Sequence, residues 1–239
     1  MTENIVVNSN NCFSISHQMT CGFMVIQKRG IGKNFLFLIK KIFLLNQNEN
    51  SMFCFKLKEK IVFYWRAKSS HGLHSPFVYS LYTSISKNAK SIKLQNDNFG
   101  FFSKKQTRIL IALFQFLKPN KVLIINNTDQ VWAKYLSKNC QIKYCNQITE
   151  LAKESKKFDL IILSNNLLIS DKEIISQLPL IISNNSVVII PHVHASKQSI
   201  KQWNNLIKEE MFSLSLDLFF VGVLFFRKES TKQDFQLRF

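Results

Sequence analysis

The segment KVLIINNTD, residues 121–129, decides which fold we expect for this chain. It begins two residues after Pro119 and places four consecutive apolar residues ahead of two asparagines. An apolar run of this length between turn residues predicts a strand buried on both faces, as the strands of parallel sheets are. Helical apolar spacing is found on both sides of it along the chain. This order is typical of the opening of a nucleotide-binding α/β domain, whose ligand lies at the turn after the first strand.

Composition bounds the classes of function that the chain can have. With 239 residues, 46% of them hydrophobic, it can hold one α/β domain plus an N-terminal appendage. Its net charge of +17 favours contact with nucleic acid or anionic lipid. The lysines are spread along the chain without the dense basic runs of nucleic-acid-binding tails. A solvated basic surface is therefore the favoured interpretation, and we identify no specific nucleic-acid motif.

The cysteines and the N-terminal apolar segment bear on localisation. Five cysteines form no CxxC pair, which predicts reduced thiols and a cytoplasmic protein. The apolar segment Phe35–Leu45 is interrupted by Lys40 and Lys41, and it is shorter than the roughly 20 residues that span a bilayer. We therefore predict neither a transmembrane segment nor a signal peptide. A helix lying on a membrane surface is the alternative interpretation of this segment.

The sequence divides into three parts. Residues 1–51 are polar and rich in turn residues, so we expect a poorly ordered extension, with Met52 as the working start of the protein. Residues 52–102 predict a helical N-terminal segment. Residues 103–239 predict the α/β domain, because buried strands and amphipathic helices alternate along them before a terminal hairpin.

Apolar spacing predicts the remaining elements. Helices are expected at Phe53–Lys68, after Pro76, and after Ser103, which has a glutamine three residues later and so predicts a capping box. Further strands are expected at five segments: Gln141–Cys145, Phe158–Leu163, Ser186–Ile190, Ser213–Leu218 and Val221–Arg227. The third of these follows an expected turn at Asn184 and Asn185. The fourth alternates strictly between apolar and polar residues, which predicts a half-exposed strand.

Two pairs of histidines stand close together in the sequence. His71 and His74 flank a compact break ahead of Pro76, where satisfying the helix ends is favoured over a catalytic role. His192 and His194 are separated by one residue and could share an ion on an extended segment. No third ligand is evident for them, so a capping or surface role is favoured over metal binding and no metal site is predicted.

Two blocks of sequence resemble a known family. They are His71-Gly-Leu-His-Ser-Pro-Phe-Val78 and the tail that runs from Leu216-Asp-Leu-Phe-Phe through Phe225-Phe-Arg-Lys-Glu229 to Phe235-Gln-Leu-Arg238. On these residues the chain, from about Phe53 to Phe239, resembles a group of class I S-adenosylmethionine (SAM)-dependent methyltransferases from Bacteroidetes. The resemblance implies an α/β fold with a Rossmann-like sheet, mostly parallel with a C-terminal antiparallel β-hairpin, plus N-terminal helices. It also implies SAM as the cofactor.

The residues at the implied cofactor site depart from the family pattern. After its first strand the family has an acidic residue and a glycine-rich loop, where this chain has Asn126, Asn127, Thr128 and Asp129. The acidic residue that ends the family's second strand is replaced by Asn146, and an Asp-Gly pair after its fourth strand by Ser164 and Asn165. Paired aspartates after the fifth strand correspond to Pro191 and His192. An asparagine can adopt left-handed backbone conformations, but its side chain obstructs the close approach that glycine permits.

Two hypotheses on function follow. The first is a SAM-dependent methyltransferase-like protein that transfers a methyl group to an unidentified O or N acceptor. Asp129 would bind the cofactor amine, the other polar residues that follow the strands would line the cofactor pocket, and His192 or His194 would act as base. The second is a catalytically inactive pseudo-methyltransferase that binds a protein partner or scaffolds a complex. Replacement of four expected site positions together favours it, since a single loss could be compensated.

Overall fold

The structure is a computed structural model. It describes residues 52–94, 102–125, 136, 140–146, 156–163, 172–226 and 231–239, with only the backbone of 52–54 and 172–174. The chain divides into two compact units, Met1–Phe55 and Lys56–Phe239, and nearly all of the described residues belong to the second. The extension expected at residues 1–51 lies outside the described residues, as does most of the helix expected directly after the central strand.

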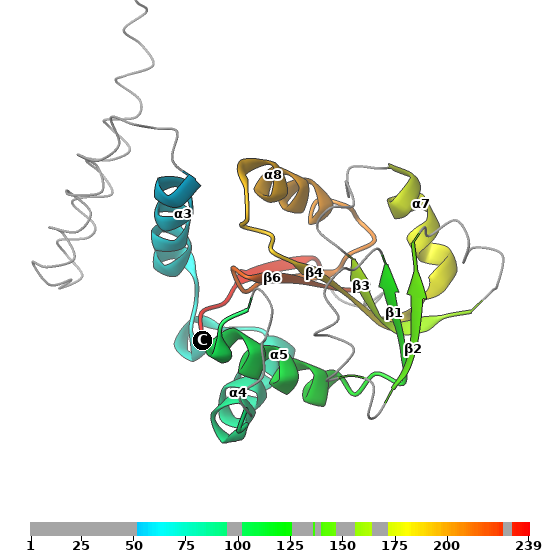
Figure 1. Cartoon of the computed structure of the whole chain (residues 1–239), viewed down its shortest axis with the longest axis horizontal. Coiled ribbons are helices and arrows are strands. Elements are labelled where there is room, and N and C mark those ends of the chain that lie inside the picture. The colour runs from blue at the N-terminus through cyan, green and yellow to red at the C-terminus, as the bar shows by residue number, and fades with distance from the viewer. Residues whose placement is uncertain are drawn as a thin grey trace, which may run out of the picture. The chain divides into compact units, whose positions relative to one another are not determined.

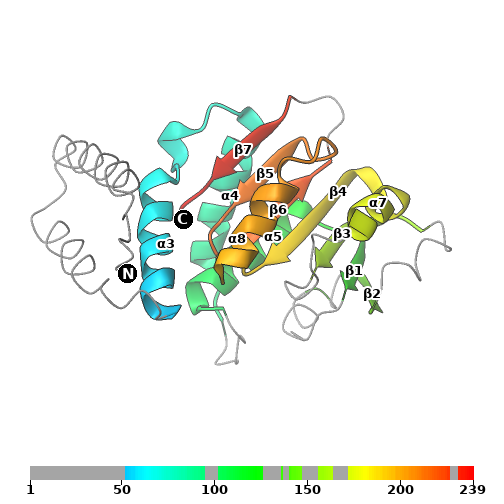
Figure 2. The same cartoon turned by 90° about the horizontal axis from the view of Figure 1, so that it is seen from above.

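A seven-stranded sheet forms the centre of the second unit. Its strand order is β2-β1-β3-β4-β6-β5-β7 (Figure 2). The strands are β1 (Lys121–Ile125), β2 (Gln141–Cys145), β3 (Phe158–Leu163), β4 (Ile182–Pro191), β5 (Leu214–Asp217), β6 (Val221–Phe225) and β7 (Gln233–Gln236). The first four run parallel to one another, β6 is antiparallel to both β4 and β5, and β7 is parallel to β5.

Helices cover both faces of this sheet (Figure 1). On one face lie α4 (Pro76–Ser91) and α5 (Lys104–Leu117), and on the other lie α7 (Lys172–Ile181) and α8 (Lys197–Leu206). Alternate residues of β1 belong to opposite hydrophobic cores, since Val122 and Ile124 pack with α4 and α5 whereas Leu123 packs with α7 and α8. Every residue of the apolar run in β1 therefore faces one core or the other, as predicted for a strand covered on both sides.

The fold class expected from the sequence is confirmed: the chain has a Rossmann-like α/β sheet of the class I methyltransferase type, mostly parallel, with a C-terminal antiparallel β-hairpin. Doubly wound sheets of this kind typically have strands in the order 3-2-1-4-5-6. Within the described residues, β2 has no strand on its outer side, in agreement with the short connection between the first strand and Phe158. The sheet reaches seven strands because β7 adds to the opposite edge.

Local signals set the starts of two helices as predicted. The Ser103 hydroxyl accepts a hydrogen bond from the Gln106 backbone N–H (3.3 Å), and the Gln106 side chain accepts one from the Ser103 N–H (2.8 Å). This capping box begins α5, and Lys118, in the left-handed region with φ of 45°, ends it. Pro76 occupies the first turn of α4 after an extended Ser75.

Two predictions about the strands are wrong. Asn184 and Asn185 do not form a turn before β4 but lie within it, where the pairing with β3 is irregular between Phe158 and Leu160. There the Ser186 hydroxyl donates to the Phe158 carbonyl (2.6 Å), which replaces a regular ladder bond. Strand β5 is not half-exposed. All four of its residues are buried, because its polar side chains find hydrogen-bond partners within the protein instead of water.

The N-terminal segment is joined to the C-terminal residues. It comprises α3 (Met52–Arg66), the short 3₁₀ helix η2 (Ser70–Gly72) and α4. Between α3 and η2, the Lys68 N–H donates to Gln236 O (2.8 Å) and the Lys68 carbonyl accepts from Arg238 N–H (3.1 Å). Lys68 thus forms a parallel bridge with Leu237 beside the end of β7. This edge pairing positions α3 next to the turn between β5 and β6.

Candidate functional site

The carboxyl ends of the parallel strands meet at one edge of the sheet. Ile125, the last residue of β1, is paired with Cys145 at the end of β2 and with Leu163 at the end of β3. The carboxyl ends of these three strands therefore lie side by side. In doubly wound folds this edge is where ligands bind, next to the strand at which the order reverses. Here that strand is β1, with β2 on one side of it and β3 on the other.

The predicted cofactor residues are only partly described. Asn146 is exposed and directly follows β2 at this edge. The remaining candidates lie outside the described residues: Asn126, Asn127, Thr128, Asp129 and Ser164.

His192 lies in the turn after β4, near the same edge. Its backbone has a φ of 60°, a conformation that is uncommon for residues other than glycine, and its N–H donates to the Phe220 carbonyl (2.7 Å). Its ring is stacked on Phe102, with centroids 4.8 Å apart and planes 8° from parallel. The left-handed turn and the aromatic contact together fix the orientation of this half-buried ring.

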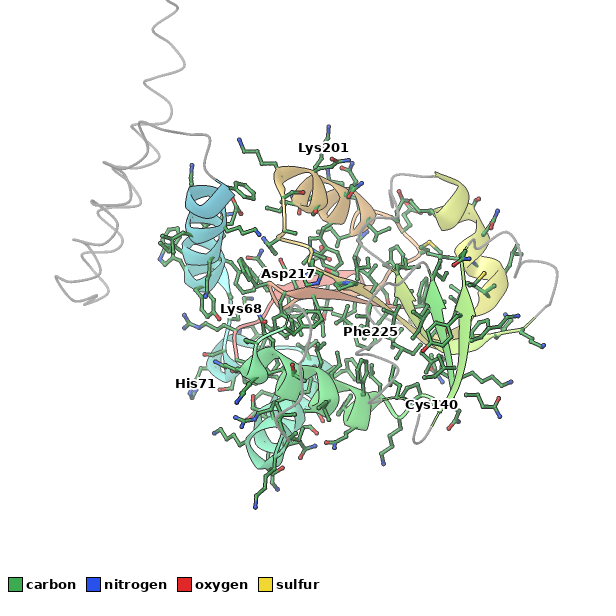
Figure 3. All side chains as sticks on the ribbon, in the orientation of Figure 1. Lys68, His71, Cys140, Lys201, Asp217 and Phe225 are labelled. Atoms are coloured by element: carbon green, nitrogen blue, oxygen red, sulfur yellow. The ribbon has the colours of Figure 1, made fainter. Side chains whose placement is uncertain are left out.

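His194 forms a buried pair with Asp217, which sequence analysis missed. The His194 Nε2 atom lies 2.8 Å from Asp217 Oδ2, and the two residues are only 9% and 4% exposed. On the other side of the ring, Nδ1 lies 4.0 Å from Glu59 Oε2 on α3. The imidazole therefore stands between two carboxylates that come from different elements. In Figure 3 Asp217 lies at the end of the sheet that faces α3.

Asp217 is held by a network of its own. Its Oδ1 accepts the Phe219 N–H (2.8 Å), and its Oδ2 also accepts a longer bond from the Gln236 amide (3.4 Å). With this carboxylate accepting from Nε2, a neutral His194 would carry its lone pair on Nδ1. Nδ1 is buried and has no hydrogen-bond partner among the described residues.

Two phenylalanines close the surroundings of the His194 ring. Phe219 is stacked on it with centroids 4.8 Å apart, and Phe63 of α3 meets it edge-on at 5.4 Å. Phe219 has a φ of 73°, so the tight β5–β6 turn places this ring at a backbone conformation unfavourable for phenylalanine. As it stands, the pair has the chemistry of an Asp–His dyad but no open approach to its second nitrogen.

The two histidines do not face a common ion. His192 stacks on Phe102 whereas His194 stacks on Phe219, so the i, i+2 arrangement expected for an extended segment is replaced by a turn. Within the described ranges, no group of three or more potential ligands could hold a metal ion. His71 and His74 are both exposed.

An open pocket lies beside the dyad, with a cavity volume of ≈ 180 Å³. It is formed by α3, the first turn of α5, the β5–β6 turn and the residues after β7. Its described lining is Lys60, Phe63, Tyr64, Ser103, Lys105, Gln106, Ile109, Leu218, Phe219, Phe220, Leu237, Arg238 and Phe239. Phe63 and Phe219 are shared with the surroundings of His194, so the pocket and the dyad are separated by these rings.

The sequence held one usable signal for Asp217. It is an acidic residue at the end of an alternating strand, two residues before the hairpin aromatics, and alternation alone predicted exposure to water. Its partner lies 23 residues earlier in the chain, so no local spacing connects them. Glu59 could not be singled out from the sequence either, because it is one of several charged residues on a predicted helix.

The strand order and directions define a Rossmann-like α/β fold with a mostly parallel sheet and an antiparallel C-terminal hairpin. Neither a protein-family model nor a curated protein sequence matches the chain. Similar solved structures include a Podospora anserina methyltransferase bound to SAH, with 13% identity, a TM-score of 0.39, and coverage of 72% of this chain and 96% of that one. A Geobacter sulfurreducens methyltransferase has 10% identity, a TM-score of 0.39 and coverage of 64% and 89%. An O-methyltransferase from Bacillus cereus, in complex with SAH, has 12% identity, a TM-score of 0.35 and coverage of 65% and 94%.

TM-scores this low do not identify a fold by themselves. The fold is identified by the strand order and strand directions described above. In the part of the chain that the structure covers, no helix combines the length and the apolar character that crossing a membrane requires. Cys140 and Cys145 are free thiols.

Proposed function

We propose that the chain is a SAM-dependent methyltransferase-like protein that binds SAM at the carboxyl ends of β1, β2 and β3. The observation that carries the proposal is the register, which aligns Ile125 with both Cys145 and Leu163 at the reversal point of the strand order. This is the edge that binds nucleotide-containing ligands in doubly wound folds. The proposed cofactor residues follow these strands: Asn126, Asn127, Thr128, Asp129, Asn146 and Ser164.

The chemistry proposed is methyl transfer to an unidentified O or N acceptor. SAM supplies an electrophilic methyl group on a sulfonium, and the protein contributes mainly proximity and orientation. Asp129 would bind the cofactor amine. Of the two candidate bases, His192 is nearer the cofactor edge, whereas both ring nitrogens of His194 are directed at carboxylates. The Nε2 atom of His192 is itself buried, so an acceptor would have to approach its other ring nitrogen.

A catalytically inactive pseudo-methyltransferase is the second candidate. The specific observation that favours it is the enclosure of His194 Nδ1, which gives an acceptor no route to that nitrogen in the described structure. Such a protein would retain the sheet and bind a protein partner. In either case we place the protein in the cytoplasm, in keeping with the two free thiols.

Isothermal titration of SAM and SAH into the full chain tests the first proposal. We expect a Kd in the micromolar range, about −8 kcal/mol. Asp129→Ala should weaken binding at least tenfold, whereas Glu210→Gln, which changes an exposed carboxylate in the turn after α8, should not. Absence of heat from a folded sample would refute cofactor binding. Binding without formation of SAH in any acceptor screen would favour the inactive form.

A further inference from the structure

We propose that the pocket between α3, α5 and the β5–β6 turn binds a small ligand that combines one planar aromatic ring with a negatively charged group. The described lining of this pocket comes from α3, α5, the β5–β6 turn and the residues after β7. The inference does not require methyl transfer and applies equally to an inactive protein.

The walls of the pocket are aromatic. Phe63 and Phe219 stand 5.2 Å apart between ring centroids at an interplanar angle of 57°, and Phe220 continues the wall from the same turn. Offset and edge-to-face contacts with a third ring are the arrangements that such a corner favours. The cavity volume of ≈ 180 Å³ is close to the ~150 Å³ of an apolar cavity that accommodates benzene. The space therefore suits one ring.

The rim of the pocket is cationic. Lys60, Lys105 and Arg238 line it, and no acidic side chain belongs to the described lining. Lys105 Nζ uses one donor on the Phe239 main-chain oxygen (2.6 Å), and Arg238 Nη1 uses one on the Tyr64 carbonyl (3.0 Å). A lysine has three donors and an arginine has five, so both cations retain donors for an anion. Lys60 is exposed and makes no hydrogen bond or ion pair within the described residues.

The neighbouring carboxylates do not neutralise this rim. Asp217 is buried and directs its oxygens at His194, Phe219 N–H and the Gln236 amide. Glu59 faces His194 Nδ1. Ser103 Oγ and Gln106 Oε1 are engaged in the capping box, and Lys105 Nζ is engaged by the Phe239 oxygen, so recognition of a negative charge falls mainly to Lys60 and Arg238. An anionic group is therefore the complement that the rim lacks.

Phenyl phosphate is the probe for a calorimetric titration of the full chain, compared with inorganic phosphate and with phenol. We expect phenyl phosphate to bind at least tenfold more tightly than either, because only it matches both the ring wall and the cationic rim. Lys60→Gln should weaken its binding about three- to tenfold through loss of a charge-assisted contact. Lys56→Gln removes an exposed lysine from the same helix outside the pocket and is the matched control.

Two results would overturn the proposal. One is that phenyl phosphate does not bind, or binds no more tightly than inorganic phosphate does. Equal binding of the two would reflect only the attraction of anions to a chain with a net charge of +17. The other is equal binding by Lys60→Gln and Lys56→Gln. Circular dichroism shows whether each variant is folded, and both changes are at exposed positions. SAM binding is titrated on the same samples, so failure of this pocket is distinguished from failure of the cofactor site.

Discussion

Gly222 offers the sharpest test of the packing in this structure. It lies in the middle of the antiparallel strand β6, paired with Ile190 of β4 and Asp217 of β5. A Cβ atom placed on it would lie 2.4 Å from Cζ3 of Trp203 and 2.6 Å from Cη2. Trp203, on α8, is 4% exposed and so has little room to withdraw. Gly222→Ala therefore forces the indole away from the sheet.

The size of the effect follows from these distances. Ordinary Cβ contacts begin at 3.4 Å, so the ring would have to move by about 1 Å. Overpacking of a well-filled core costs about 1–3 kcal/mol, and replacing a strand glycine by alanine returns roughly 0.5–1 kcal/mol of backbone entropy. We expect the free energy of unfolding to fall by about 1–2 kcal/mol, measured as a lower denaturation midpoint in urea with an unchanged m-value.

A matched control and a double mutant decide whether the indole is the cause. Gly72→Ala places its Cβ 3.4 Å from the flexible Lys68 side chain, so its stability should stay within about 0.5 kcal/mol of the original. In a Trp203→Leu background the clash is gone, and Gly222→Ala should then be nearly neutral, with a coupling energy of at least about 1 kcal/mol. Equal effects of Gly222→Ala in both backgrounds would refute this account.

Three further predictions concern the dyad, a thiol and a helix cap. Asp217→Ala leaves the buried His194 Nε2 without its partner and should lower the free energy of unfolding by about 2–4 kcal/mol. Urea denaturation measures this loss, and a loss under about 1 kcal/mol would argue against a buried pair. Burial is the main cause that raises the pKa of the Cys140 thiol above its usual 9.0, and the nearby Asp159 carboxylate adds to it. The thiol therefore loses its proton at a higher pH in the native state than in the unfolded chain. The contribution of the neutral thiol to stability is thus complete below pH 9 and is lost as the pH rises above it. Above pH 9 the free energy of unfolding should fall more steeply for the original protein than for Cys140→Ser. Ser103→Ala removes the cap of α5 and should cost about 1 kcal/mol in the same assay, while Ser103→Asp should retain most of it.

The elements that were predictable from sequence are those whose local signal agrees with their final surroundings. The apolar runs of β1 and β3 admit no solvent-facing residue, so burial on both faces could be inferred from composition alone. The capping box at Ser103 depends on a spacing of three residues within one turn and needs no tertiary partner. Signals of this kind survive folding because nothing distant competes with them.

Other features depend on partners far along the chain. Strand β7 has the sequence QDFQ, with neither an apolar run nor alternation of apolar and polar residues, and it exists because β5 offers a free edge to pair with. Asn184 and Asn185 favour a turn locally, but pairing with β3 extends β4 through them. The burial of Asp217 follows from a histidine that enters from the end of β4. Candidate site residues could be named from the resemblance, whereas the pairing of His194 with Asp217 could be found only from the three-dimensional structure.

The bridge between Lys68 and Leu237 has a consequence for the order in which the protein is made. Tyr64 and Arg238, which share a hydrogen bond at this junction, are 174 residues apart. At about 5–20 residues per second, a ribosome adds the second roughly 10–35 s after the first. During that interval the aromatic side of α3 has no strand edge to dock on. The nascent chain should therefore offer this helix to chaperones until Arg238 and its neighbours emerge.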